Sequence, residues 1–188
     1  MFIGAIGGVS YDSGIESESE VVFVGTGGVE NQQEGSFIGW KFNPSIGITA
    51  DIQFGEQEYN ETYMNVSVIY KPTKLEYSNE LTFDLTYLEV PLGVISFPFD
   101  NRNLFVTGHI APTFLIDEGV ETARGLLIED IEYNNFDLRF KGGGGIKINK
   151  DARVGLNFSF SALSFIDDDI LDINNVYVGL DLAYFINK

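Results

Sequence analysis

The segment Ile46–Gly55, IGITADIQFG, alternates strictly between two classes of side chain. Its even positions are all apolar, and its odd positions are all small or polar. Successive side chains leave a β-strand on opposite sides, so this pattern predicts a strand with one apolar and one polar face. In a soluble sandwich or barrel the apolar face points inward, whereas in a membrane-spanning barrel it points outward to lipid. The orientation of that face therefore decides what the chain can fold into.

The same alternation recurs in later segments, over residues 104–116, 152–162 and 176–186. Their polar faces carry mainly Gly, Ser, Thr and Asn with a few isolated charges. A soluble strand usually presents Lys and Glu to water, so these faces are unlike an ordinary soluble surface. We therefore expect the apolar faces to point outward and the polar faces to line the inside of a barrel.

The layout of the chain also favours a membrane barrel. We expect eight strands, near 2–11, 36–43, 46–55, 81–97, 104–116, 133–148, 152–164 and 175–186, and no helix. Tight turns at 43–45, 100–103 and 149–151 alternate with long polar connections at 12–35, 56–80, 117–132 and 165–174. This is typical of an eight-stranded antiparallel up-and-down transmembrane β-barrel with short periplasmic turns and long extracellular loops. A change of phase in segment 81–97 predicts a β-bulge near Thr86 and Tyr87.

The isolated charges on the predicted polar faces are five basic and five acidic residues, with Asp84 among the acidic ones. An eight-stranded barrel is just wide enough for side chains to fill it, and an unpaired charge inside would cost several kcal/mol. We therefore expect a network of ion pairs and hydrogen bonds to fill a closed lumen. Its predicted members are Lys41, Asp51, Glu89, His109, Asp137, Arg139, Lys141, Lys147, Arg153 and Asp181.

Several stretches together resemble a known family. The most specific is YLEVPLGV at 87–94, which is similar to a strand motif of the small porin-like outer-membrane β-barrel proteins of Bacteroidota-type bacteria. GWKFNPSIGITADIQFGEQEY at 39–59, FDLRFKGGGGIKI at 136–148 and VYVGLDLAYFI at 176–186 support it. The resemblance implies an eight-stranded barrel in the outer membrane. It carries over no catalytic residues, because the family has no shared active site.

The charge of the chain limits its partners. A formal net charge of −17 argues against nucleic acid, whose phosphates require Lys and Arg. Of the 28 acidic residues, 21 fall in the four predicted long connections, which fits a surface where divalent cations bridge lipopolysaccharide. Ordinary solvation of loops explains the same pattern. We expect outer-membrane lipid, lipopolysaccharide and another envelope protein as the partner classes.

Other features exclude several classes of protein. There is no cysteine, which excludes disulfide scaffolds and thiolate metal sites. No run of about 18 apolar residues occurs, which excludes a membrane-spanning helix. The first residues lack a basic start and a long apolar core, so we expect no signal peptide in this sequence and a bacterial outer-membrane location for the mature protein.

Three motifs suggest more specific chemistry. His109, the single histidine, shares the polar face with Thr107 and Thr113, and an embedded hydrolase would need such a base. Closely spaced carboxylates suit Ca²⁺, which makes Asp167, Asp168, Asp169 and Asp172 weak candidates for a metal site. KGGGGIKINK at 141–150 lacks the ending of a phosphate loop and lies in a predicted strand, where glycines permit close approach of neighbouring strands.

These observations favour one domain, 1–188, that is not an enzyme and binds no cofactor. The leading hypothesis is an outer-membrane protein without an open pore, which acts through acidic extracellular loops as a structural, binding or envelope-complex component. An outer-membrane lipid-modifying enzyme or protease is one alternative. A soluble calycin-like ligand carrier, with its apolar faces inside, is the other.

Overall fold

The computed structural model describes residues 2–16, 21–22, 32–33, 41–57, 60–77, 81–98, 103–122, 133–163, 166–168 and 171–186. Side chains are described for 43–54, 61–74, 82–98, 103–119, 133–163 and 177–186. Every regular element in these ranges is a β-strand. None of the described residues forms a helix of the length and apolarity needed to cross a bilayer.

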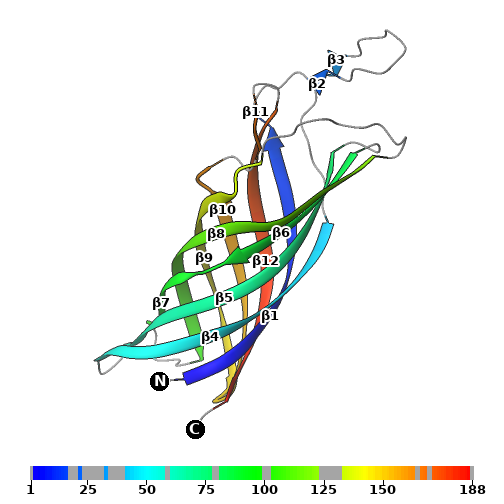
Figure 1. Ribbon diagram of the computed structural model, residues 1–188. Coiled ribbons are helices and arrows are strands. Elements are labelled where there is room, and N and C mark those ends of the chain that lie inside the picture. The colour runs from blue at the N-terminus through cyan, green and yellow to red at the C-terminus, as the bar shows by residue number, and fades with distance from the viewer. Residues whose placement is uncertain are drawn as a thin grey trace.

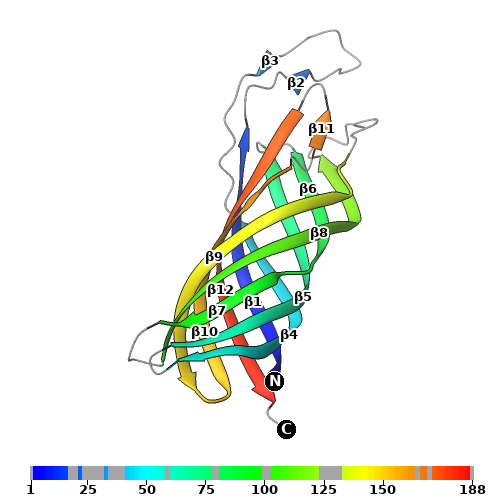
Figure 2. The same ribbon diagram turned by 90° about the vertical axis from the view of Figure 1, so that its left-hand side faces the viewer.

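Eight antiparallel units, here called staves, close into a barrel (Figures 1 and 2). Each stave is one strand, except one stave that consists of two strands. The ring closes because β1 (Phe2–Glu16) pairs with both β4 (Lys41–Gln57) and β12 (Leu171–Ile186). The sixth and seventh strands form one interrupted stave between β5 and β8. The staves are β1 (Phe2–Glu16), β4 (Lys41–Gln57), β5 (Asn60–Tyr77), β6 (Leu81–Glu89) with β7 (Leu92–Phe97), β8 (Leu104–Thr122), β9 (Phe136–Asn149), β10 (Ala152–Ser161) and β12 (Leu171–Ile186). Three short strands lie outside the ring: β2 (Val21–Val22), β3 (Gln32–Gln33) and β11 (Ile166–Asp168).

Both ends of the chain lie at the same end of the barrel, here called the terminal end (Figure 1). The β4–β5, β7–β8 and β9–β10 connections lie at this end and are short. The opposite end, here called the far end, receives the connections from β1 to β4, β5 to β6, β8 to β9 and β10 to β12. The predicted alternation of long and short connections is therefore present, with one exception between β5 and β6.

The predicted number of strands is right, but two assignments are wrong. The expected turn at 43–45 lies inside β4, so the predicted strands 36–43 and 46–55 are not separate; residues 36–40 are outside the described ranges. The expected loop at 56–80 contains the whole of β5. Buried Asn43 accepts a hydrogen bond from the backbone N of Lys74 at 2.9 Å, so contact with β5 overrides its local preference for a turn.

The assignment of β5 moves some of the acidic residues that were predicted for extracellular loops to the opposite end of the barrel. Since β4 runs toward the terminal end, Glu56 and Glu61 lie there with the connection between them. The far end therefore has fewer acidic residues than the predicted loops assigned to it.

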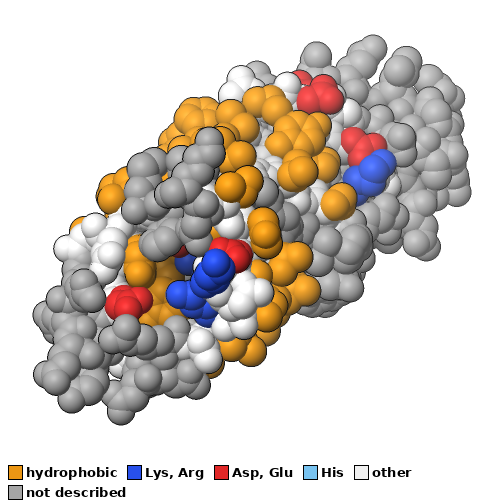
Figure 3. Space-filling view, turned by 90° about the horizontal axis from the view of Figure 1, so that it is seen from below, with side chains coloured by type: hydrophobic (Ala, Val, Ile, Leu, Met, Phe, Trp, Pro, Cys, Tyr) orange, Lys and Arg blue, Asp and Glu red, His pale blue; other side chains and the backbone are white. Residues whose placement is uncertain are grey.

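The apolar faces point outward, as predicted. The exposed fractions of Ile48, Leu156 and Val178 are 64%, 64% and 45%. Figure 3, viewed from the terminal end, shows hydrophobic side chains gathered on the described outer wall. This is the lipid-facing surface of a transmembrane barrel, and the calycin-like arrangement, which requires these side chains inside, is wrong.

The predicted bulge is present, but on the neighbouring strand. Thr86 pairs with Asp117 and Tyr87 with Leu115, so the extra residue is Ile116 of β8. The face of β6 is not reset. Phe83 and Leu85 are each 1% exposed and point into the barrel, and they lie in the half of β6 that begins at the far end.

The orientation of the outer wall predicts a position-dependent cost for a cation. Leu156→Arg places a charge in the hydrocarbon layer and should destabilise the folded barrel by about 2–4 kcal/mol. Leu104→Arg, at the terminal end of β8, should cost only about 0–1 kcal/mol. Urea unfolding in phospholipid vesicles measures both values. Equal costs at the two positions would contradict the assignment of a lipid-facing belt.

Candidate functional site in the barrel lumen

A cluster of ionic side chains surrounds Glu89 in the middle of the lumen. The Glu89 carboxylate accepts hydrogen bonds from Lys141 Nζ at 2.6 Å and from Arg139 Nη1 at 2.7 Å. Lys71 Nζ lies 3.8 Å from Glu89, and Arg139 Nε donates to Asp137 at 2.7 Å. Four of these five side chains are at most 2% exposed and Lys141 is 9% exposed, so they stabilise one another with little help from water.

Aromatic rings complete this cluster. The Arg139 guanidinium lies 4.6 Å from the centre of the Tyr87 ring, and Lys71 Nζ lies 3.7 Å from the centre of the Tyr177 ring. Such contacts stabilise cations that have lost their water. Tyr87 and Glu89 of the motif YLEVP thus both belong to this group of side chains around Glu89, here called the central cluster.

A second cluster crosses the barrel closer to the terminal end. Arg153 Nη1 of β10 donates to Asp51 of β4 at 2.7 Å, although β12 and β1 separate these two strands in the sheet. Asn65 donates to Asp51 at 2.7 Å and to Thr49 at 2.8 Å. The Arg153 guanidinium also lies 4.3 Å from the centre of the Phe185 ring. This ion pair therefore connects two non-adjacent strands through the lumen.

The hydrogen bonds of Asn65 determine which ring nitrogen of His109 carries the hydrogen. Asn65 uses its amide nitrogen toward Asp51 and Thr49, so its oxygen is the acceptor that faces His109 Nε2 at 2.9 Å. Nε2 therefore carries the hydrogen, and Nδ1 of the neutral ring is an acceptor. The structure gives His109 an amide partner, which does not form the carboxylate–histidine–nucleophile arrangement of a hydrolase.

Apolar side chains lie on both sides of the polar network. Tyr63, Ile95, Phe97 and Phe105 form a buried cluster toward the terminal end, with the rings of Phe97 and Phe105 5.9 Å apart. On the other side, buried Phe83 and Leu85 lie in the half of β6 that begins at the far end. Side chains thus occupy the lumen at three successive levels.

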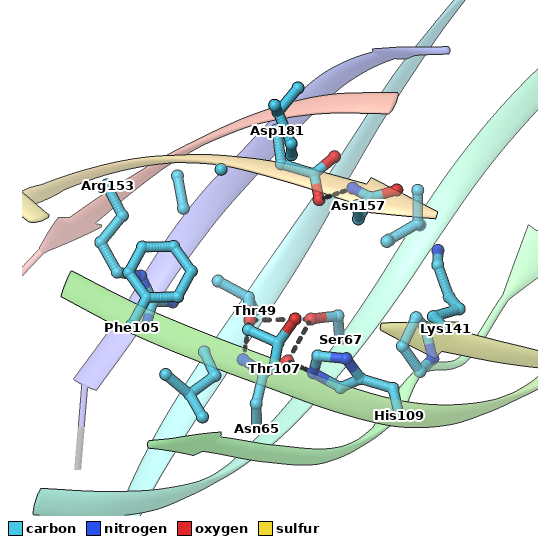
Figure 4. Close-up of a pocket in the computed structure, with 16 residues that line it drawn as sticks. Thr49, Asn65, Ser67, Phe105, Thr107, His109, Lys141, Arg153, Asn157 and Asp181 are labelled. Atoms are coloured by element: carbon cyan, nitrogen blue, oxygen red, sulfur yellow. Dashed lines mark hydrogen bonds between the residues drawn. The ribbon is translucent and has the colours of Figure 1, made fainter. Parts of the chain in front are cut away.

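A cavity of about 70 Å³ remains between the two polar clusters (Figure 4). Polar side chains from β4, β5, β8, β9, β10 and β12 line it, together with Ile95 and Phe105. Gly155 of β10 is part of its wall. A Cβ at Gly145 would lie 2.6 Å from the Phe105 ring, so a larger residue at this position of β9 would collide with the ring. The KGGGG segment is therefore part of a strand wall and not a phosphate loop.

The structure places most predicted network residues in the lumen. Asp51, Glu89, Asp137, Arg139 and Arg153 are buried, while His109, Lys141 and Asp181 line the cavity. Lys147 lies over the Phe97 ring at 5.6 Å. The side chain of Lys41 is outside the described residues.

Two predictions concern aspartates outside the lumen network. Asp84 lies on the outer face of β6 and pairs with Lys74 at 2.7 Å, so its inclusion in the lumen charge balance is wrong. The side chains of Asp167, Asp168 and Asp172 and the whole of Asp169 are outside the described residues, although β11–β12 pairing sets Asp167 opposite Asp172. No metal-holding group of three His, Cys, Asp or Glu occurs among the described side chains.

Sequence reasoning missed the contributions of β5. Lys71, Asn65 and Ser67 are all buried network members, and all lie in the segment predicted to be a loop. The signal was present: Met64, Val66, Val68 and Tyr70 are apolar at alternate positions. Applying the period-2 test to this segment would have found the strand.

The comparisons with known proteins concern the fold. No family model matches the chain, and no curated protein matches it either. Among solved structures, Ail, the attachment invasion locus protein of Yersinia pestis, is 11% identical over 98% of both chains, with a TM-score of 0.46. The outer membrane protein OprG from Pseudomonas aeruginosa is 10% identical over 100% of this chain and 97% of its own, with a TM-score of 0.46. The outer membrane enzyme PagL is 12% identical over 94% and 98%, with a TM-score of 0.44. This chain has the fold of an eight-stranded outer-membrane β-barrel. These weak similarities carry no information on its role.

The central cluster predicts a large difference between two carboxylate-to-amide substitutions. Glu89→Gln keeps the shape but leaves three cations without their common anion, and should destabilise the barrel by about 3–5 kcal/mol. Asp84→Asn breaks the exposed pair with Lys74 and should cost at most about 1 kcal/mol. Urea unfolding of both variants in the same lipid measures the difference. Similar small losses for both would show that Glu89 does not hold the lumen together.

Proposed function

We propose that this protein is an integral outer-membrane barrel of the porin-like Bacteroidota type, without an open pore. It acts at its far end as a structural, binding or envelope-complex component. The belt of outward apolar side chains supports its place in a membrane. The position of both termini at the end with the short connections supports the far end as the extracellular one.

One observation supports the absence of a pore: buried ion pairs join non-adjacent strands at two levels of the lumen. Asp51 of β4 pairs with Arg153 of β10 across two intervening strands, and Glu89 of β6 binds cations from β5 and β9. A conducting channel requires a continuous column of water, and these buried pairs, with the aromatic cluster below them, occupy that column. The lumen thus stabilises the barrel, and recognition is left to the far end.

The sequence supports an acidic recognition surface at the far end. The connections 17–40, 123–135 and 162–170 are longer than those at the terminal end, and long connections on a rigid scaffold are the usual sites of recognition. They carry Glu18, Glu20, Glu30, Glu34, Glu129, Asp130, Glu132, Asp167, Asp168 and Asp169. Carboxylates of this kind suit divalent cations that bridge lipopolysaccharide, or a basic patch on another envelope protein.

The closed lumen predicts the electrical behaviour of the purified protein. Reconstituted into planar lipid bilayers, it should give no stable conductance steps, because the ion pairs and aromatic side chains exclude a water column. Heat-modifiable migration on a gel serves as the control that the protein is folded. Regular conductance steps from folded protein would contradict a closed lumen.

If the acidic residues at the far end bind the partner, their neutralisation should weaken binding without affecting folding. Changing Glu18, Glu20, Glu129 and Asp130 to Gln should leave folding intact and weaken capture of the partner severalfold, because the surface charge is lost. Photo-crosslinking in cells, from a probe at position 27, measures capture, with Glu56→Gln and Glu61→Gln at the terminal end as the matched control. Unchanged crosslinks in the far-end variant would count against recognition by these acids.

A further inference from the structure

Asn157, in the wall of the lumen cavity, has an unsatisfied acceptor. Its side chain is 9% exposed, and its amide nitrogen donates to the Asp181 carboxylate. The carbonyl oxygen Oδ1 finds no hydrogen-bond donor among the described residues. A buried acceptor without a donor is destabilising, so the cavity must supply one. Figure 4 shows Asn157 and Asp181 on one side of the cavity and Asn65 and His109 on the other.

The lining of the cavity discriminates among possible ligands. A metal cation is disfavoured because Lys141 and Arg153 both line the cavity. An anion is disfavoured because the Asp181 carboxylate and the free oxygen of Asn157 lie in the same wall. An apolar molecule would leave these polar groups desolvated. The ligand must therefore be neutral and able both to donate and to accept hydrogen bonds.

Size restricts the ligand further. A cavity of about 70 Å³ has room for roughly five water molecules when each needs about 10–15 Å³ by this measure. Thr107 and Lys141 supply donors, while Asn157 Oδ1 and His109 Nδ1 supply acceptors. Empty cavities in proteins are apolar, whereas polar ones of this size hold water.

We infer that the lumen cavity binds a cluster of ordered water molecules, one of which donates to Asn157 Oδ1. The cluster bridges the Asn157–Asp181 pair on β10 and β12 to the Asn65–His109 pair on β5 and β8. The two sides of the lumen thereby become one hydrogen-bonded network. The water is part of the structure and is held between Ile95 and Phe105 on one side and the central ionic cluster on the other.

The single histidine makes this inference measurable in a bilayer. In water-edited solid-state NMR of the full chain labelled with ¹⁵N-histidine and ¹³C,¹⁵N-phenylalanine and -leucine, magnetisation from water should reach the His109 ring early. It should reach Phe83 and Leu85 severalfold later, because these side chains lie in the apolar level. The ¹⁵N shifts should also identify Nε2 as the protonated nitrogen. Equal build-up at His109 and at these apolar residues would overturn the inference.

Crystals soaked in rubidium bromide separate water from ions. Density about 2.5–3.0 Å from Asn157 Oδ1 without anomalous signal from rubidium or bromine is the expected result. An anomalous peak in the cavity, or an absence of density at a resolution that shows other buried waters, would overturn the proposal.

Asn157→Leu should lose the water that donates to Oδ1, whereas Thr113→Val, in the lumen but outside the cavity wall, should keep all the cavity waters. Either result is independent of what binds at the far end.

Discussion

The structure depends on one constraint: hydrocarbon offers no partner for a backbone N–H or C=O group. A sheet in that environment must satisfy every strand edge within itself, which only a closed ring achieves. The pairing of β1 with β12 provides the closure. Pro91 shows how strictly the rule is kept. It interrupts the stave between β6 and β7, yet the Pro91 carbonyl accepts a hydrogen bond from Ser67 N, and Val90 N donates to the Pro112 carbonyl.

Closure with apolar side chains outside forces the polar alternate positions into a narrow interior. Those side chains have little water, so each charge must find a protein partner. Glu89 meets this need for three cations, and Asp51 meets it for Arg153. Where no side chain reaches, as at Asn157, the same requirement leads to bound water. The ion pairs, the rings and the cavity are thus consequences of which face meets the lipid.

Sequence reasoning identified the orientation of the faces because it depends only on residue type and a period of two. Strand boundaries were harder, since they depend on contacts made elsewhere. Asn43, Pro44 and Ser45 read as a turn, but pairing with β1 and the hydrogen bond to Lys74 hold them extended. The strand count came out as eight because splitting β4 compensated for the omission of β5. Lys71 was lost with β5, which left the central cluster one cation short.

The motif YLEVP shows why a short pattern can be informative in such a barrel. Tyr87, Glu89 and Pro91 are alternate residues, so all three face the lumen, while Leu88 and Leu92 face outward. Tyr87 lies against Arg139, and Glu89 gathers the cations. Pro91 lines the cavity just below them. A substitution at Tyr87 or Glu89 changes the surroundings of Arg139, because both residues contact its buried guanidinium. The motif therefore specifies the filling of the barrel, and its presence says more about closure of the lumen than about what the far end recognises.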